Sequence, residues 1–403
     1  MGTRRTGTLP AYPPTMRGGT STPWARFDDL VSGRAVACPP PHRVLIANRA
    51  QDVAPVLAEV ERATATGDWA FGYVSYEAAP GLDPKLEVTP PAADDPPLAW
   101  FGLCGSSPVE VPPVTLPSGG PHETRWTPDW TDEDHAKAVT RVREHIAAGE
   151  TYQCNLTDRL RATVDGDPAT LYAGLALAQG AAYNAYLDLG RFVIASASPE
   201  LFFEWAGDHL RTRPMKGTAA RGRDTTEDDE QARRLRASPK ERAENLMILD
   251  LLRNDVAKVA TVGSVEVPEL FTLERYPTVW QMTSEVTARL RPGCGLVDIF
   301  RALFPCGSVT GAPKARSMQV IRDLETGPRG VYCGAVGLIA PPSEAFRARF
   351  NVAIRTAVVD RRSAAAVYGA GGGITWDSDP AAERAELLTK AAVLSQPQAL
   401  HRA

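Results

Sequence analysis

The sequence contains few of the residues that build metal sites and disulfide frameworks. Its 403 residues include six cysteines and six histidines. The cysteines are widely spaced without a C-x-x-C pair, and no two histidines have the spacing of an H-x-x-x-H motif. These absences argue against a zinc site and against a fold stapled by disulfides. Scattered free cysteines are typical of a reducing compartment, so we expect a cytoplasmic protein.

An excess of positive charge and long apolar runs are also missing. With 44 Lys+Arg against 48 Asp+Glu, the formal net charge is -4, which disfavours electrostatic binding to nucleic acid or to an anionic membrane surface. No apolar run reaches the roughly 20 residues that span a bilayer, and the N-terminus lacks the apolar core of a secretory signal. We therefore expect no nucleic-acid partner and no membrane partner.

The composition is otherwise that of an ordinary globular protein, with 43% hydrophobic and 23% charged residues. Residues 1–22 are rich in Thr, Gly, Pro and Arg and are expected to be a disordered tail. The Pro-rich residues 108–121 mark the best boundary between an N-terminal part, residues 23–121, and a larger part, residues 128–397. We expect both parts to form one interlocked unit.

Strand and helix signals alternate along both parts. Strands are expected over residues 69–77, 98–103 and 152–160, where apolar residues alternate. A hairpin is expected over residues 182–196, which turn at a Leu-Gly pair. Acidic residues in the first turn support a helix over residues 131–148.

A single lysine stands between a proline and a glycine in residues 211–218, RTRPMKGT. Pro214 presets its own φ and favours an extended residue before it, and Gly217 lets the chain turn where a side chain would not fit. The stretch is predicted to end a strand over residues 208–212 and to present Lys216 from a turn. Taken alone, such a lysine is usually a solvated loop residue, so its surroundings must decide its role.

Residues 239–258 predict a helix that carries two acidic residues on one side. Ser238 is placed as N-cap, with proline at the first helical position and Glu241 at the third, which is a capping-box pattern. Apolar residues cover most of the circumference and predict a buried helix. Glu241 and Glu244 lie three residues apart. For Glu241 a purely capping role is an equal alternative, whereas a buried Glu244 needs a cation or several donors.

A second acidic pair, Glu383 and Glu386, follows the glycine run at residues 371–373. Backbone without side chains can approach an anion closely. The alternative is a solvated acidic helix face behind a flexible turn. Two such pairs on separate helices can converge on one Mg²⁺, an ion that prefers one or two carboxylates together with waters and ligand oxygens.

Residues 304–314 form a turn rich in Gly and hydroxyl groups, in front of a helix expected over residues 313–324. Thr310 and Gly311 stand before the helix N-terminus, which is a ready anion site, although the spacing of a nucleotide P-loop is absent. Arg355 ends an apolar strand; it is either a surface ion-pair residue or, if buried, a forked donor for a carboxylate.

In this order, the segments resemble the chorismate-utilising enzyme family, which includes anthranilate synthase component I, aminodeoxychorismate synthase component I, and the isochorismate and salicylate synthases. The resemblance runs from about residue 132 to 394, and residues 69–77 and 100–103 are similar to the family's N-terminal part. It implies an α+β fold in which two facing antiparallel β-sheets carry helices outside and the ligand lies between them.

Within the family, three positions resemble the aminodeoxychorismate synthase branch. Gln153 stands where the water-adding members carry a lysine. Residues 214–218, PMKGT, are similar to the P-I-K-G-T of that branch, whereas anthranilate synthases typically have P-I-A-G-T. Asn245 follows Glu244, where anthranilate synthases commonly have histidine. The resemblance thus implies component I of an aminodeoxychorismate synthase, a transferase on the route to 4-aminobenzoate and folate.

Three alternatives stay open beside this interpretation. Anthranilate synthase component I would give 2-aminobenzoate, and a 2-amino-2-deoxyisochorismate synthase would not need Lys216. The third is a non-catalytic subunit that only activates a glutamine amidotransferase, in which case the two acidic pairs are ordinary helix faces.

The resemblance implies a role for each candidate residue. Lys216 is expected to attack C2 of chorismate as its neutral amine, and Glu200 to act as general acid for the departing C4 hydroxyl. Glu244 and Glu386 are the leading Mg²⁺ ligands, with Glu241 and Glu383 in direct or water-mediated support. Substrate contacts are expected from Arg355, Tyr332, Thr310, Gly311, Gly371, Gly372 and Gly373, with Asn155 and Asp250 as weaker candidates.

Ammonia is expected from a partner. The chain shows no glutaminase nucleophile around a cysteine, so we expect a separate glutamine amidotransferase subunit to supply ammonia for addition at C4. One departure from the family is Cys306, which stands where a glycine or alanine is common in an F-P-G-G-S turn. The backbone of that turn is therefore expected to differ.

Overall fold

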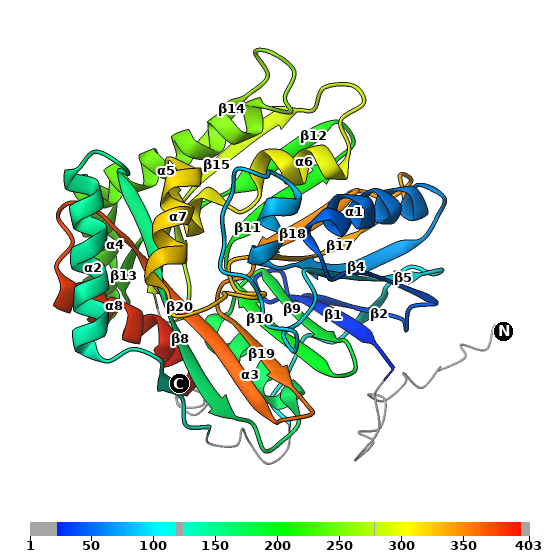
Figure 1. Ribbon diagram of the computed structural model, residues 1–403, viewed down its shortest axis with the longest axis horizontal. Helices are drawn as coiled ribbons and strands as arrows, with labels where there is room; N and C mark the ends of the chain where they lie inside the picture. Colours follow the sequence, from blue (N-terminus) through cyan, green and yellow to red (C-terminus); the bar gives the residue numbers. More distant parts are fainter. Residues whose placement is uncertain (1–21, 118–123, 278, 396–403) are drawn as a thin grey trace.

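Two antiparallel β-sheets face each other and carry the helices on their outer sides (Figure 1). The structure, a computed structural model, describes residues 22–117, 124–277 and 279–395. The predicted disordered tail lies outside these residues except for Thr22. The two sheets with outer helices confirm the α+β prediction. No helix among the described residues is long and apolar enough to cross a membrane.

Sheet A contains ten strands within the described residues. Its order is β16 (Gly311–Ala312), β8 (Gln153–Thr163), β20 (Ala365–Ile374), β19 (Thr356–Asp360), β10 (Phe192–Ser198), β9 (Tyr183–Asp188), β1 (Trp24–Asp29), β2 (Arg34–Cys38) and β6 (Val109–Val111), with β7 (Thr127–Pro128) beside β8. The predicted hairpin over residues 182–196 is confirmed as β9 and β10.

Sheet B also contains ten strands of the described chain. Its order is β13 (Met215–Ala220), β15 (Val279–Arg289), β12 (His209–Arg213), β11 (Leu201–Ala206), β18 (Ala348–Val352), β17 (Ala335–Ile339), β4 (Trp69–Val74), β5 (Ala99–Cys104) and β3 (Arg43–Ala47), with β14 (Glu266–Arg275) beside β15. Each sheet therefore combines strands from both sides of residues 108–121.

The helices pack against the outer faces of the sheets. They are α1 (Ala50–Ala65), α2 (Asp132–Ala147), α3 (Pro168–Gln179), α4 (Thr225–Ala237), α5 (Pro239–Ala257), α6 (Leu296–Leu303), α7 (Lys314–Leu324) and α8 (Pro380–Ala391). Short 3₁₀ turns are η1 (Tyr76–Gly81), η2 (Gly307–Val309) and η3 (Ala392–Ser395). Helix α5 packs on β13 and β15, α3 on β10, and α8 on β20.

Strand β4 shows how sequence alternation builds the core. Phe71 and Tyr73 enter the cluster between the two sheets, where they meet residues such as Leu187 of β9. Ala70 and Val74, on the other face, enter the cluster that β4 shares with α1 and α5. Successive side chains of a strand point to opposite faces. All six residues are buried because both faces are covered.

Helix α5 confirms the predicted cap but not the predicted burial all round. The Ser238 hydroxyl accepts a hydrogen bond from the Glu241 backbone N–H at 3.3 Å. Ile248 and Leu249 are buried, yet Leu246 is 45% exposed. A helix with apolar residues around its whole circumference can still have an exposed side. Here α5 packs on sheet B with one face, and the opposite face is exposed to solvent.

The lysine predicted in a turn lies on a strand instead. Strand β12 ends at Arg213, β13 begins at Met215, and both pair with β15. Gly217 has a φ of 97° where the pairing register shifts between Met215 and Thr218. This irregularity is a β-bulge, which re-aims the neighbouring side chains. The prediction was wrong because pairing with β15, more than 60 residues away in the chain, is invisible to a local pattern.

A buried ion network joins η1, β8 and η2. The Arg329 guanidinium donates to Glu325 at 2.6 Å and to the carbonyl oxygens of Val309 and Asn155, both at 2.7 Å. The Glu77 carboxylate accepts the backbone N–H of Arg329 at 2.7 Å. Because β8 and the residues around η2 carry candidate site residues, this network holds two walls of the site together.

Replacing Arg329 with methionine is expected to lower the free energy of unfolding by about 3–5 kcal/mol, because a buried carboxylate loses its partner. Urea denaturation measures the change. The matched control is Lys137→Met on α2, whose ion pair with Glu133 at 2.7 Å is exposed and is worth less than about 1 kcal/mol. Equal losses in the two variants would contradict a structural role for the network.

Candidate active site

Lys216 lies where the edges of the two sheets meet. A Cβ atom added to Gly373 of β20 would stand only 2.5 Å from the Lys216 Nζ atom, and it would also collide with the Gln153 side chain of β8. A side chain at position 373 would therefore displace the ends of the Lys216 and Gln153 side chains. The Asn245 side chain donates to the Lys216 carbonyl oxygen at 3.1 Å, which ties β13 to α5.

Glu200 faces Lys216 from the short connection between β10 and β11. Its side chain is buried, with the residue 2% exposed, and its Oε1 atom accepts a hydrogen bond from the Ser308 hydroxyl at 2.6 Å. Burial raises the pKa of Glu200 to about 7, while the bond from Ser308 and the charge of Lys216 oppose that shift. A carboxyl group that keeps its proton near neutral pH can serve as a general acid.

The two acidic pairs approach this lysine from α5 and α8. The Glu241 Oε2 atom lies 3.2 Å from where a Cβ on Gly217 would stand. On the other side, Glu383 Oε2 and Glu386 Oε1 lie 3.2 and 4.0 Å from where a Cβ on Gly372 would stand. Glu241 therefore lies beside the neighbour of Lys216, and Glu383 and Glu386 lie beside the neighbour of the glycine that contacts it.

Mutual repulsion and burial shift the protonation of these carboxyl groups. Burial raises the pKa of Glu241, and the neighbouring Glu244 and Glu386 raise it further. Burial likewise raises the pKa of Glu383, although Ser378 donates to it at 2.6 Å. Burial also acts to raise the pKa of Glu386, but the adjacent lysines more than compensate and lower it. Carboxylates of both helices thus share one electrostatic environment.

These carboxylates fit a magnesium ion that keeps part of its water shell. Among the residues that the structure describes, no three Asp, Glu, His or Cys side chains stand close enough to form a complete metal cage. Mg²⁺ does not need one, because it is usually held by one or two carboxylates together with waters and oxygens of an acidic ligand. Two carboxylate pairs around a shared space provide oxygen donors of this kind.

Lys390 belongs to the same cluster, although the sequence analysis missed it. Its Nζ atom donates to the Gly371 carbonyl at 2.8 Å and to Glu386 Oε1 at 2.7 Å. Burial lowers the pKa of Lys390 against the opposing effect of Glu386. The available signal was its spacing, since a residue four positions after Glu386 lies on the same face of the helix.

Gln153 lies at the centre of the site and was treated in the sequence only as a mark of the family branch. It is buried, and neither polar atom of its side chain has a hydrogen-bond partner among the described residues. A buried amide without partners is costly. Such a group at a candidate site is expected to meet a ligand there.

Thr310 and Gly311 lie beside β8, as parts of one wall. The Thr310 carbonyl accepts the Asn155 N–H at 2.8 Å, while its hydroxyl donates to the Cys306 carbonyl at 3.1 Å. Gly311 has a φ of 148° and pairs with Cys154 of β8. The glycines at 371–373 lie in strand β20 and pair with β8, so the flexible turn considered for them is wrong.

Arg355 and Tyr332 lie on the side of Lys390, whereas Asp250 lies elsewhere. Arg355 donates to the Lys390 carbonyl oxygen, and the buried Tyr332 ring packs on Gly369 of β20. Asp250 is exposed and forms an ion pair with Arg253 at 2.7 Å. The structure thus brings together the other candidates and leaves Asp250 outside.

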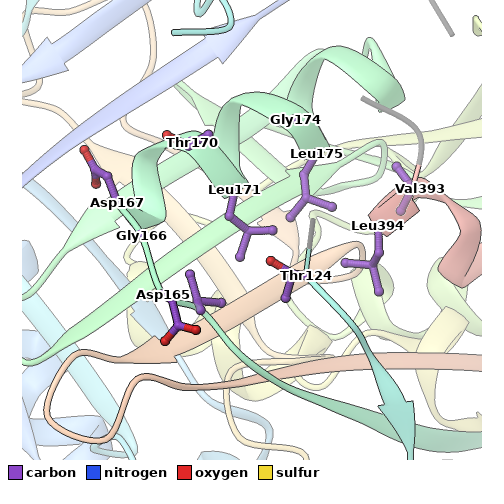
Figure 2. A pocket seen from close by; sticks show the side chains of 11 residues that line it. Thr124, Asp165, Gly166, Asp167, Thr170, Leu171, Gly174, Leu175, Val393 and Leu394 are labelled. Atoms are coloured by element: carbon purple, nitrogen blue, oxygen red, sulfur yellow. The ribbon is translucent and has the colours of Figure 1, made fainter. Parts of the chain in front are cut away.

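A cavity at the other end of β8 contains none of these residues. It is lined by Leu171 and Leu175 of α3, by Val393 and Leu394, and by Asp165 just beyond β8 (Figure 2). A strand rises about 3.3 Å per residue, so roughly 30 Å separate it from Gln153. Its wall combines polar and apolar residues, and it is not the site described above.

Comparison with known proteins shows what these residues resemble. The profile of one family, described as chorismate binding enzyme, matches residues 40–396. Aminodeoxychorismate synthase component 1 of Escherichia coli is 40% identical over 265 residues, 66% of this chain and 57% of that protein. Anthranilate synthase component 1 of Streptomyces coelicolor is 41% identical over 281 residues, 69% of this chain and 54% of that protein.

The chain therefore spans less than two thirds of the length of these two relatives. Among solved structures, anthranilate synthase component I from Streptococcus pneumoniae has the same fold, with a TM-score of 0.74 at 23% identity. That match covers 98% of this chain and 95% of the other.

Glutamine substitutions at Glu241 and at Glu386 are each expected to weaken Mg²⁺ binding about tenfold or more, because each removes a charged oxygen donor from one of the two helices. Calorimetric titration with MgCl₂ alone measures the affinity without turnover. Glu133→Gln on the exposed face of α2 is the control and is expected to bind like the unmodified protein. Unchanged affinity in both site variants would show that the two helices do not share an ion.

Proposed function

Because this chain belongs to the family of chorismate-binding enzymes, we propose that it converts chorismate and ammonia into 4-amino-4-deoxychorismate, as component I of an aminodeoxychorismate synthase. The observation that carries the proposal is the position of Lys216. Its amine lies against Gly373, within the electrostatic reach of Glu200, Glu241 and Glu386. A lysine so enclosed is suited to nucleophilic attack.

Sequence identity does not choose between the two amine-adding branches, since relatives of both names are about equally similar at 40% and 41%. Lys216 does choose. Amination at C2 needs only a positioned amine donor, whereas amination at C4 with a transient bond at C2 needs a nucleophile in the protein. Anthranilate synthase is the second candidate, and fluorescent 2-aminobenzoate would identify it.

Chorismate has two carboxylates, and two neighbouring parts of the site, joined by the ion pair of Lys390 with Glu386, would each take one. Arg355 and Lys390 lie together next to the backbone of β20, where the enolpyruvyl carboxylate would bind with Tyr332, Thr310 and Gly311 lining the pocket. Glu244 and Glu386, supported by Glu241 and Glu383, would hold Mg²⁺, which when bound supplies Lewis-acid polarisation of the ring carboxylate.

The first chemical step forms a bond from the Lys216 nitrogen to ring carbon C2. The ring double bonds shift, the C4–O bond breaks, and the proton of Glu200 leaves on the hydroxyl as water. Ser308 stabilises the carboxylate that remains on Glu200.

The second step reverses the first with ammonia as nucleophile. Ammonia forms a bond to C4, the double bonds shift back, and the C2–N bond to Lys216 breaks. The proton that the new ammonium group loses returns Glu200 to its acid form, so one water leaves for each ammonia that enters. The free Gln153 amide beside Lys216 offers a hydrogen-bonding group within this space.

Ammonia is proposed to come from a separate glutamine amidotransferase subunit. The relatives carry the name component 1, which implies a second component for them. Cys306 beside Glu200 is buried, and burial raises its pKa to about 12, which does not suit a thiolate nucleophile. The protein alone is therefore expected to use ammonium salts and not glutamine.

Lys216→Ala is expected to lose 4-amino-4-deoxychorismate by at least about 100-fold, because no nucleophile remains for C2, and to gain products aminated at C2. Liquid chromatography with mass detection, using chorismate, MgCl₂ and ammonium, measures both. Lys216→Arg keeps the charge without a nucleophilic amine and is expected to fail equally. Exposed Lys137→Ala is the matched control; full product formation by the arginine variant would contradict the covalent step.

The rate is also expected to fall as pH rises through about 7, the pKa of Glu200 in the folded protein. The carboxyl group must hold its proton to act, so the acid form is present below this pH and lost above it. Ser308→Ala removes a donor that favours the carboxylate, and it is expected to move the alkaline limb of kcat/KM to higher pH. A limb that stays in place in this variant would show that another group titrates.

A further inference from the structure

Cys306 places its thiol next to the group that we propose as general acid. The residue precedes η2 and is 3% exposed. Its Sγ atom lies 3.2 Å from the Ser308 hydroxyl oxygen and 3.9 Å from Glu200 Oε1. The Ser308 hydroxyl lies 2.6 Å from the same carboxyl oxygen. One turn of the chain therefore directs two side chains at one atom of Glu200.

The Ser308 hydroxyl stands between the other two groups. It donates to Glu200 Oε1 at 2.6 Å and is also in donor position toward the Cys306 sulfur at 3.2 Å. The thiol in turn is a weak, long-range donor toward the same carboxyl oxygen at 3.9 Å. Burial raises the pKa of Cys306 to about 12, and the nearby Glu200 adds to this. The thiol is therefore a neutral donor at every pH at which the protein would be assayed.

We propose that Cys306 is a positioning residue for Glu200, which acts through its 3.2 Å contact with Ser308 and so holds the serine hydroxyl next to the carboxyl group. This inference rests on the proposed function for the role of Glu200 but not for the contacts. The hydrogen bond from Ser308 favours the carboxylate form of Glu200. A thiol that keeps the hydroxyl in place therefore favours the same form.

The remaining groups around Glu200 do not depend on Cys306. Lys216 and the backbone N–H of Met215 approach from β13. Lys314, which acts on Cys306 electrostatically, is held by Asp255 at 2.9 Å and by the Leu303 carbonyl at 3.0 Å. A substitution of the thiol leaves these contacts in place, so a change in the titration of Glu200 reports on the Cys306–Ser308 contact.

The test is the pH dependence of kcat/KM for Cys306→Ala, measured with chorismate, MgCl₂ and ammonium. Loss of the thiol is expected to move the alkaline limb upward by about half a pH unit, and Ser308→Ala to move it further. In the double variant the cysteine substitution is expected to add nothing to the shift caused by Ser308→Ala, because interacting groups are not additive. Cys104→Ala, which removes another buried thiol, one that donates to a backbone carbonyl at 3.2 Å, is expected to leave the limb unchanged.

Two results would overturn the inference. One is a Cys306→Ala profile that coincides with that of the unmodified protein, and the other is an equal shift from Cys306→Ala with and without Ser308. The titration of Glu200 is also measurable without turnover, by ¹³C NMR of carboxyl-labelled glutamate with Glu200→Gln for assignment. If no 4-amino-4-deoxychorismate forms, the proposed function fails, while the NMR titration of the same variants still decides the role of Cys306.

Discussion

The close contact between Lys216 and Gly373 is the constraint on which the rest of the site depends. It joins the edge strand of sheet B to strand β20 of sheet A, and a side chain at position 373 would displace the lysine amine from its present place. The bulge at Gly217 aims the lysine, and the Asn245 side chain fixes its backbone from α5. The amine therefore has a defined position only in the complete two-sheet fold, since no local segment could place it.

Carboxyl groups and cationic side chains are concentrated around this contact. Three lysines, Lys216, Lys240 and Lys390, face five carboxyl groups, those of Glu200, Glu241, Glu244, Glu383 and Glu386. The pKa values of these carboxyl groups are shifted in opposite directions. Burial raises the pKa of Glu200 to about 7, so this group can hold a proton. The lysines lower the pKa of Glu386 and keep it ionised. Two titratable groups pushed in opposite directions can take different chemical roles, one as acid and one as metal ligand.

Much of this arrangement could be predicted from local patterns. Spacing three apart placed Glu241 with Glu244 and Glu383 with Glu386, and the cap at Ser238 was found from residue types alone. The same helix geometry would also have excluded Asp250, because nine residues at about 100° each put it half a turn from Glu241. The strand position of Lys216 and its nearness to β20 could not be predicted, since both depend on pairing between distant segments. Lys390 was missed because only the acidic residues of its helix were considered as candidates.

Backbone conformation shows that the fold also holds the substrate side of the site under constraint. Arg355 has a φ of 53° and Cys333, next to Tyr332, a φ of 62°; for residues other than glycine, this region costs about 1–3 kcal/mol and persists only where neighbours enforce it. At Arg355 the enforcing contacts are visible, because its carbonyl accepts the Ala197 N–H at 3.0 Å and its guanidinium donates to the Lys390 carbonyl. Strand β10 and helix α8 therefore fix the arginine from two sides. The fold imposes this conformation on Arg355 before any ligand binds. A carboxylate that bound to Arg355 would therefore lose little binding free energy to ordering the arginine.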